Sequence, residues 1–295
     1  MAKIPVVFTF DKRIILGASV AIKSLIESAN KDTIYDIKIL HSDLSLKNQA
    51  NISKLVSNTK HSISFYYIDK NIFKGLKKSK GSWTEIVYYR LLIPEIIFDE
   101  KVIYSDVDVY FKKDLTEIYE TEIGNNEIIA VRAEINSPEA KGHKYFKENK
   151  NDFIYWSGFM VMNCKKLKEE KYFEKFMNTA REFKDKLRFY DLDVLNLTCK
   201  NIKSASLQYC ILEPIFEFDD YTKMRNYEYL SKFYTKQDFE LAKNCPIIIH
   251  YAGELGKPWR RKNPPEYYKE TIKRLPKELV KYTFRDIRKK FFSKG

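Results

Sequence analysis

Two aspartates stand one residue apart in the segment EKVIYSDVDVYF, residues 100–111. Residues 101–105 have the pattern of a buried strand, so Asp106 and Asp108 follow the end of that strand. In an extended chain, side chains at positions i and i+2 point to the same side, where two carboxylates repel each other. A hard divalent cation bound between them removes this repulsion. The pair therefore predicts a metal site, although a solvated pair in a turn has the same pattern.

The metal hypothesis has two consequences for variants of the pair. Replacing Asp106 or Asp108 by Asn should abolish an activity that needs the metal. The same change should slightly stabilise the metal-free protein, because it relieves the repulsion between the carboxylates.

A second polar cluster follows an apolar segment in IIIHYAGELGKPW, residues 247–259. His250 can ligate a metal, glycines such as Gly253 let the backbone approach phosphate oxygens, and Lys257 can neutralise them. A single histidine at a strand end is more often structural. The combination of these residues is more specific, and it indicates a site for a metal and a phosphate group.

Hydrophobic patterning predicts the elements that must position these side chains. Strands are expected at 4–10, 35–40, 62–68, 101–105, 127–132, 158–163 and 246–250, and helices at 14–28, 45–56, 84–96 and 165–187. Alternating strands and helices are typical of an α/β fold with a mostly parallel sheet flanked by helices. The less regular stretch between 133 and 245 is expected to form lids and a second, mixed lobe.

Sheets of this kind bind ligands outside the carboxyl ends of their strands. Asp11, Asp106 and His250 each follow a predicted strand, so the fold could bring the three side chains together.

The basic residues are concentrated at the C-terminus. The 295-residue chain has a net charge of +13, of which residues 257–295 carry +10 and the rest only +3. A nucleic-acid-binding protein usually has a basic stripe over its folded surface, so this distribution argues against that class. The sequence has no apolar run of about 18 residues that would predict a transmembrane helix. Residues 1–12 have too short an apolar stretch for a signal peptide, so none is expected.

The cysteines also bear on the compartment. Cys164, Cys199, Cys210 and Cys245 have wide, irregular spacings and form no metal-binding motif. We expect reduced, half-buried thiols in a cytoplasmic protein.

The last twenty residues, 276–295, predict a basic amphipathic helix that begins at Pro276. Its hydrophobic face would consist of Val280, Phe284, Ile287 and Phe291. Its basic residues would be Lys281, Arg285, Arg288, Lys289 and Lys290. Such a helix can lie on an anionic membrane without spanning it. The alternative is a helix that packs on the rest of the chain with its charges solvated.

The order of strand, Asp-Val-Asp and late His-x-x-Gly…Lys-Pro-Trp resembles the retaining glycosyltransferases of family 8. That family includes bacterial lipooligosaccharide galactosyl- and glucosyltransferases and glycogenin. The resemblance covers roughly residues 4–260. It implies one Rossmann-like domain of the GT-A fold at 1–260, followed by the basic tail at 261–295. It also implies a UDP-sugar donor and Mn²⁺ or Mg²⁺.

The resemblance also implies roles for individual residues. The metal ligands would be Asp106, Asp108 and His250. The donor would be bound by Thr9, Asp11, Arg90, Asp106, Val107, Asp108, Gly158, Gly253 and Lys257. Asp191, in YDLDVLN at 190–196, would lie near the donor sugar and act in catalysis. From the residues alone, Asp191 fits a helix N-cap equally well, and Arg90 fits a structural ion pair.

Three positions depart from the family pattern. Three residues, rather than two, separate Gly253 from Lys257. Trp156 and Ser157 precede Gly158, where the family commonly has Asn followed by Ser or Ala. Leu192 stands where the bacterial galactosyltransferases often carry Gln. A leucine side chain has no nucleophilic or hydrogen-bonding atom, so a mechanism that needs that glutamine is excluded.

The expected function is therefore a metal-dependent, retaining transfer of galactose or glucose from a UDP-sugar to a cell-surface glycan such as lipopolysaccharide. The expected location is the cytoplasm, with the tail on the inner face of the cell membrane. An inverting glycosyltransferase and a basic polyanion-binding protein are the alternatives. The expected partners are the UDP-sugar donor, a glycan or glycolipid acceptor and the anionic membrane surface, without nucleic acid.

Overall fold

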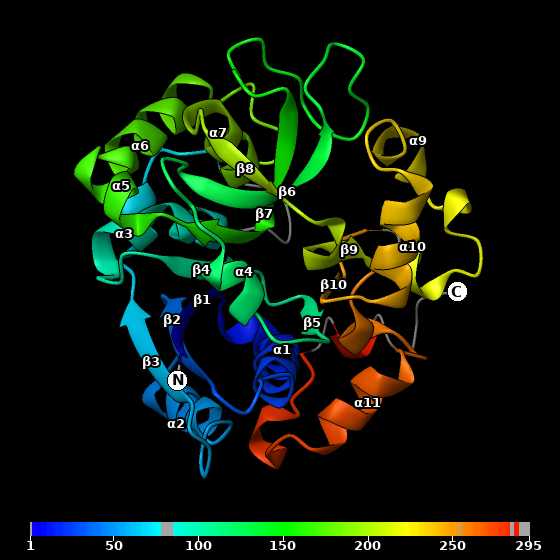
Figure 1. The fold of residues 1–295 in the computed structure, drawn as a ribbon. Coiled ribbons are helices and arrows are strands. Elements are labelled where there is room, and N and C mark those ends of the chain that lie inside the picture. Colours follow the sequence, from blue (N-terminus) through cyan, green and yellow to red (C-terminus); the bar gives the residue numbers. More distant parts are fainter. Residues whose placement is uncertain (1, 78–84, 254, 284–285, 289–295) are drawn as a thin grey trace.

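Two sheets form the centre of the molecule, and helices cover them (Figure 1). The computed structural model describes residues 2–77, 85–253, 255–283 and 286–288. The strands are β1 (Ala2–Thr9), β2 (Thr33–His41), β3 (Ser62–Tyr67), β4 (Val102–Ser105), β5 (Val109–Phe111), β6 (Ile128–Ile135), β7 (Phe153–Met162), β8 (Ile202–Ala205), β9 (Ile211–Leu212) and β10 (Ile248–His250).

The larger sheet has seven strands in the order β3-β2-β1-β4-β7-β6-β8. The strands from β3 to β4 are parallel, β7 is antiparallel to both of its neighbours, and β8 is parallel to β6. The smaller sheet has the order β5-β10-β9. This arrangement confirms the predicted α/β fold with a mostly parallel, mixed sheet.

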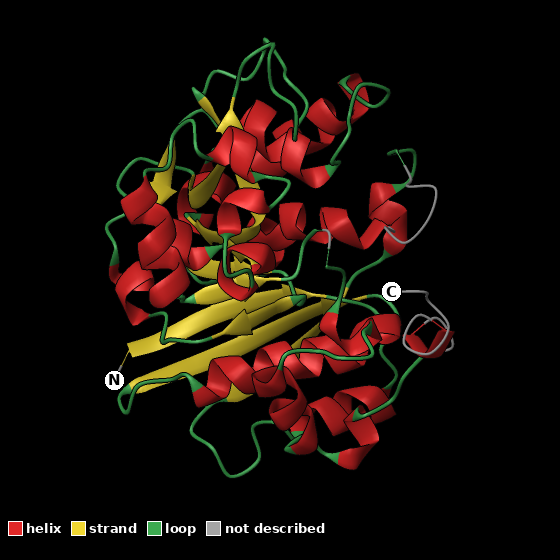
Figure 2. Cartoon of the chain, turned by 90° about the vertical axis from the view of Figure 1, so that its right-hand side faces the viewer, coloured by secondary structure: helices red, strands yellow, loops and turns green. Residues whose placement is uncertain are grey.

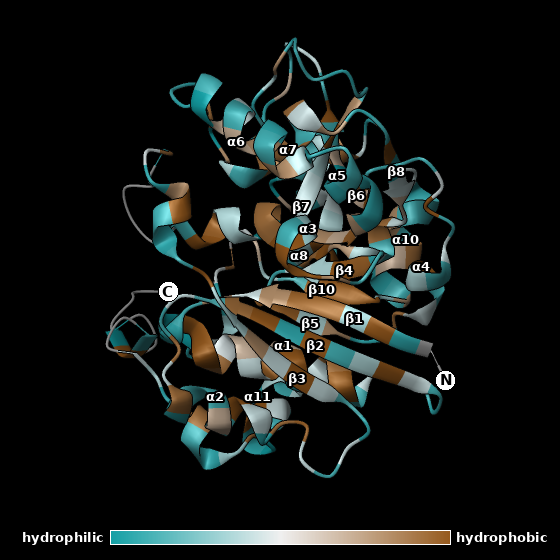
Figure 3. Cartoon of the chain, turned by 90° about the vertical axis from the view of Figure 1, so that its left-hand side faces the viewer, coloured by the Kyte–Doolittle hydropathy of each residue, from teal (hydrophilic) through white to brown (hydrophobic). Residues whose placement is uncertain are grey.

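Helices lie on both sides of the larger sheet (Figure 2). They are α1 (Ile15–Glu27), α2 (Leu46–Ser53), α3 (Ile93–Ile96), α4 (Thr116–Glu120), α5 (Cys164–Glu169), α6 (Tyr172–Glu182), α7 (Asp191–Thr198), α8 (Glu213–Glu217), α9 (Tyr227–Leu230), α10 (Lys236–Asn244) and α11 (Glu266–Lys273). Successive side chains of a strand point to opposite faces. Val6 and Phe8 of β1 therefore enter the core that contains α1, whereas Val7 enters the core that contains α5 to α7. The hydrophobic residues follow the strands and α1, and hydrophilic residues occupy the outer loops (Figure 3).

Every strand predicted from the sequence is present, but the predicted second lobe is wrong. β6, β7 and β8 lie within or beside the stretch 133–245, and all three belong to the larger sheet. The prediction missed β8, and it began β7 five residues late, at 158 instead of Phe153. Because those strands were shortened or missed, the region looked less regular than it is.

The helix predicted at 84–96 has two parts. A 3₁₀ helix, η3 (Glu85–Leu92), leads directly into α3, which contains Pro94 in its first turn. Residue 84 lies outside the described residues. Proline is tolerated there because the first helical turn needs no amide donor from it.

The single helix predicted at 165–187 is wrong, because α5 and α6 are separated at Lys171, whose φ is 55°. Leu167 and Tyr172 both enter the same core. Five positions apart on a continuous helix, they would point about 140° away from each other. The break therefore lets both elements bury their apolar residues on one side.

The helix predicted from Pro276 is also wrong at its start. Lys277–Leu279 form one 3₁₀ turn, 280–283 have no regular structure, and 286–288 are helical. Leu279 is buried in the main core, and this holds the chain against the domain. Phe284, Arg285 and residues 289–295 lie outside the described residues.

Thr283 marks the later start of that helix. Its hydroxyl accepts from the Asp286 backbone N–H at 3.2 Å, and Asp286 accepts from the Thr283 backbone N–H at 2.8 Å. This reciprocal pair is the geometry of a helix N-terminus. Asp286 is buried and also accepts from Arg260 Nε at 2.6 Å. At least the beginning of the tail is therefore attached to the domain, as in the packing alternative.

Candidate active site

The segment Asp106–Val107–Asp108 connects the two sheets. It leaves β4 of the larger sheet and enters β5 of the smaller one. The backbone N–H of Asp106 donates to the Gly158 carbonyl at 2.8 Å, and the Asp108 carbonyl accepts from the Tyr251 N–H at 2.8 Å. Val107 points into the hydrophobic core, so only its backbone faces the site. The crossing fixes both aspartates between β7 and β10.

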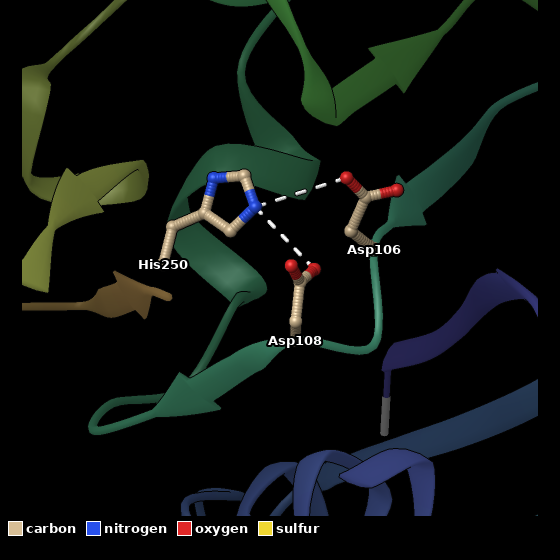
Figure 4. A group of neighbouring side chains, drawn as sticks. All are labelled: Asp106, Asp108 and His250. Carbon is tan, nitrogen blue, oxygen red and sulfur yellow. Dashed lines mark ion pairs between the residues drawn. The ribbon is translucent and has the colours of Figure 1, made fainter. Parts of the chain in front are cut away.

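Asp106, Asp108 and His250 come together at this crossing (Figure 4). His250 Nε2 lies 3.4 Å from an oxygen of Asp108 and 3.8 Å from an oxygen of Asp106. One ligand atom from each residue lies within 4.8 Å of the others. Gly158 leaves room for the group, since a Cβ there would lie 2.8 Å from His250 Cε1 and 3.0 Å from Asp106 Oδ2.

The donor atoms of this group suit a divalent metal. Two carboxylates and one imidazole offer oxygen and nitrogen ligands, a mixture that Mn²⁺ accepts and Mg²⁺ accepts less readily. Of the three residues expected to converge, Asp106 and His250 lie together, whereas Asp11 lies in a separate pocket. The ligand chemistry of the group fits the implied ion.

Positive side chains lie beside the carboxylates of Asp106 and Asp108 and offset the repulsion between them. Arg90 Nη2 donates to Asp106 Oδ1 at 2.9 Å, and Lys257 forms an ion pair with Asp108. Burial opposes ionisation of Asp108, but Lys257 and His250 together hold its pKa well below its usual range. A lowered pKa means that the ionised form stabilises the fold above the unfolded pKa. The expectation that Asp108→Asn stabilises the metal-free protein is therefore reversed.

Arg90 also pairs with Asp191, the first residue of α7. Arg90 Nη1 lies 3.2 Å from Asp191 Oδ2 and donates to the Ser157 carbonyl at 2.6 Å. Asp191 does not cap the helix, because the N-cap residue is Tyr190. Burial raises the pKa of Asp191 to about 6, against the opposing effect of Arg90. Arg90 therefore forms ion pairs, as the alternative interpretation of this residue expected, and its two partners Asp106 and Asp191 both belong to the site.

Thr9 reaches the group through Tyr104 rather than directly. Tyr104 Oη donates to Asp106 Oδ1 at 2.8 Å and therefore accepts from Thr9 Oγ1 at 3.1 Å. The Tyr104 ring also lies under the Arg90 guanidinium, 4.5 Å from its carbon to the ring centroid. Thr9 and Tyr104 thus orient the carboxylate and the guanidinium.

Asp11 lies in a separate pocket of about 210 Å³ beside the end of β1. The pocket is lined by Asp11, Arg13, Ser42, Asp43, Lys70, Glu85, Ile86 and Tyr89. Arg13 donates to Asp11 through its backbone N–H and Nε, both at 2.9 Å. The carboxylate of Asp11 is therefore held by a guanidinium inside this pocket.

The glycine-rich turn before Lys257 accommodates the extra residue. Gly253 has φ 139° and Gly256 has φ 71°, values that favour glycine, and the Gly256 N–H donates to the Gly253 carbonyl at 3.2 Å. Glu254 lies outside the described residues. Lys257 Nζ donates to the Tyr251 carbonyl at 2.8 Å. The turn therefore directs Lys257 back toward Asp108 despite its added length.

Arg261 and Trp259 hold this turn from behind. Arg261 donates to the Gly256 carbonyl at 2.5 Å and forms a bidentate ion pair with buried Glu213 of α8. Trp259 packs on α1, where a Cβ at Gly17 would lie only 2.7 Å from its ring. These contacts connect the turn to α8 and to α1.

Sequence reasoning missed several residues of the site. They are Tyr104, Ser157, Cys210, Glu213 and Arg261. Tyr104 had the pattern of a core aromatic, and Glu213 and Arg261 are 48 residues apart in the chain. Ser157 had one signal, since it lies in the pair that departs from the family pattern. The four cysteines are free, and Cys164, Cys199 and Cys210 are buried rather than half-buried.

A model of the family described as Glycosyl transferase family 8 matches residues 5–263. "General stress protein A" of Bacillus subtilis is 27% identical, with 70% of each chain covered. "Lipopolysaccharide 1,3-galactosyltransferase" of Salmonella typhimurium is 23% identical, with 87% of this chain and 73% of the relative covered.

Solved structures show the same fold. The galactosyltransferase LgtC, in complex with donor and acceptor sugar analogues, gives a TM-score of 0.75 at 24% identity, with 93% of this chain and 98% of that chain covered. The bifunctional glycosyltransferase WbbM gives 0.74 at 25% identity, and this chain spans 52% of its length. The likeness to LgtC confirms the expected GT-A fold. No helix in the described ranges is long and apolar enough to cross a membrane.

The protonation of His250 predicts that metal binding releases a proton. Burial disfavours the imidazolium, but Cys210 and Asp108 outweigh it and raise the pKa of His250 to about 10. The charged ring is thus favoured in the metal-free fold until the pH rises through that value, and a metal must displace its proton. Titration calorimetry with Mn²⁺ at pH 7.5, in two buffers of different ionisation enthalpy, should report release of about one proton.

The apparent affinity for Mn²⁺ should also rise by up to about tenfold per pH unit between pH 7 and 9. His250→Asn serves as the control, because it should bind the ion weakly and release no proton from this site. Identical enthalpies in both buffers for the unmodified protein would show that His250 is not a ligand.

Proposed function

The chain belongs to glycosyl transferase family 8, and from this premise we propose that it is a metal-dependent, retaining hexosyltransferase that uses a UDP-sugar. The observation that carries the proposal is the group of half-buried Asp106 and Asp108 with buried His250, and with Lys257 beside it. This arrangement lies at the carboxyl end of β4, where α/β sheets bind ligands.

The donor would lie across the end of the larger sheet. Bound Mn²⁺ or Mg²⁺ would supply positive charge that stabilises the departing diphosphate. Lys257 and the backbone of Gly253 would bind the phosphate oxygens, and Val107 and Gly158 would approach the donor with their backbones. The pocket beside Asp11 and Arg13 has the size and polar lining for the uridine end.

Asp191 is proposed to act at the anomeric carbon. One oxygen of this buried carboxylate lies near Arg90 but has no hydrogen-bond partner among the described residues. A carboxylate in this position can stabilise positive charge on the sugar ring as the bond to the diphosphate breaks. The neighbouring Leu192 is buried and apolar, so it cannot form a glycosyl–enzyme bond.

The acceptor is proposed to be a cell-surface glycan, such as lipopolysaccharide or lipooligosaccharide. The support is the Salmonella relative, whose name gives it as a lipopolysaccharide galactosyltransferase. The donor sugar is proposed to be galactose or glucose. Such a reaction would take place in the cytoplasm, at the inner face of the cell membrane.

The basic C-terminus is proposed to hold the enzyme at that membrane. The proposal rests on charge rather than on an amphipathic helix from Pro276. Residues 257–295 carry +10, and Arg288 and the adjacent Ile287 are exposed. Basic residues near an anionic surface contribute about 1 kcal/mol each to binding.

We expect Asp106→Asn and Asp108→Asn each to lower UDP release from a UDP-hexose by on the order of 100-fold to 1000-fold, because the diphosphate loses its counter-charge. EDTA should inhibit the unmodified enzyme, and Mn²⁺ should restore it. In the absence of metal, Asp108→Asn should also melt at a lower temperature, because Lys257 and His250 lose their partner.

Asp99→Asn is the matched control, at a half-buried carboxylate that pairs with Lys38 and precedes β4, whereas the site follows β4. Full activity in EDTA, or in either site variant, would contradict the metal assignment. A higher melting temperature for Asp108→Asn would contradict the charge balance described above.

The pKa of Asp191 predicts the acid limb of the pH profile. Because burial raises that pKa to about 6, the carboxylate is protonated below it and loses its charge. The kcat/KM for the donor should therefore fall below about pH 6, and Asp191→Asn should be slow at every pH. NMR of the product should show the α configuration of the donor.

An unchanged acid limb in Asp191→Asn would assign that limb to another group. A β-linked product would move the enzyme to the inverting class.

Sedimentation with vesicles tests the tail. Replacing Arg288, Lys289 and Lys290 together by Ser should weaken binding to anionic vesicles roughly a hundredfold at low salt, and high salt should release the unmodified protein. The control replaces Lys165, Lys168 and Lys175 on α5 and α6, which removes the same charge elsewhere. An equal loss of vesicle binding in both variants would refute a specific role for the tail. A chain that ends at Leu275 is not a suitable variant, because it would also remove Leu279 and Asp286, which are buried in the domain.

A further inference from the structure

The imidazole of His250 contacts the site through one nitrogen and a cysteine through the other. Nε2 faces the carboxylates of Asp106 and Asp108 (Figure 4). Nδ1 lies 3.4 Å from Cys210 Sγ. Both residues are buried: His250 is 5% exposed and Cys210 is 1% exposed. Cys210 is therefore behind the ring, on the side away from the carboxylates.

Strand pairing fixes this contact. Cys210 directly precedes β9, which runs parallel to β10, with His250 opposite Leu212. On the other side, Gly158 lies so close that a Cβ would fall 2.8 Å from His250 Cε1. The ring is thus held between the backbone of β7 and the thiol of Cys210.

We propose that Cys210 is a positioning residue for the metal ligand His250, a role that rests on the metal site of the proposed function. A neutral imidazole carries one proton. If Nε2 uses its lone pair for a metal, that proton must be on Nδ1, where it needs an acceptor. Cys210 Sγ is the partner that the geometry offers, and it accepts the Nδ1–H. The thiol thereby selects the tautomer in which Nε2 is free to ligate.

The choice of a thiol has a physical reason in this site. Metal-bound histidines more often donate to a carboxylate, a backbone carbonyl or a water molecule. A carboxylate behind buried His250 would add a fourth negative charge beside half-buried Asp106 and Asp108 and buried Asp191. The sulfur of a cysteine is a weak acceptor, but it orients the ring without placing a further carboxylate there.

The test measures Mn²⁺ affinity of the full chain by titration calorimetry, without donor. Cys210→Ala removes the acceptor and should weaken binding by about 10-fold to 100-fold. Cys210→Ser keeps an acceptor at the position and should stay within about threefold of the unmodified protein. Cys164→Ala removes another buried thiol, at the start of α5, and should bind Mn²⁺ normally.

Activity gives an independent readout. With UDP-hexose, Cys210→Ala should need more Mn²⁺ for half-maximal rate, but at saturating Mn²⁺ its kcat should return to within about threefold of normal. A general packing defect would instead lower kcat at every Mn²⁺ concentration and lower the melting temperature of the Ser variant as well.

The possible results distinguish an error in the role of Cys210 from an error in the metal site itself. Normal Mn²⁺ affinity in Cys210→Ala, or equal losses in the Ala and Ser variants, would overturn the role of Cys210 and leave the metal site in place. Absence of Mn²⁺ binding by the unmodified protein would overturn the metal site, and the role of Cys210 with it.

Discussion

The charge balance of three neighbouring carboxylates is the constraint on which the site depends. Half-buried Asp106 and Asp108 and buried Asp191 are brought into one region, where unpaired charges are costly. Arg90 bridges Asp106 and Asp191, while Lys257 and His250 face Asp108. The positive side chains come from segments far apart in sequence, so the site forms only when the whole domain has folded.

The smaller sheet explains how those segments meet. Its strand β5 continues from Asp108, β10 ends at His250, and β9 begins beside Cys210. One face of the site therefore comes from three short strands, of which only β10 had a clear pattern in the sequence. The larger sheet supplies the other face through β4 and β7, and the crossing at Asp106–Asp108 joins the two sheets. The turn that carries Lys257 is fixed to this frame by Arg261 and Glu213.

The sequence predicted the parts of this arrangement that depend on local pattern. Apolar strands and the two-residue spacing of Asp106 and Asp108 located the crossing, and the late His-Gly-Lys motif located its partner. Contacts that depend on long-range pairing could not be predicted, such as that between Cys210 and His250 or between Glu213 and Arg261. The break at Lys171 and the delayed helix after Thr283 were missed for a related reason. Tertiary burial of Leu167 and Leu279 outweighed a helical pattern in the local sequence.

Anomalous scattering tests the central claim most directly. Crystals grown with Mn²⁺ and UDP, measured near the manganese absorption edge, show the position of the ion independently of any activity. We expect one strong peak bonded to Asp106, Asp108 and His250 Nε2, with the diphosphate on its far side near Lys257. Bound UDP without a manganese peak at these three residues, or a peak on other side chains, would contradict it.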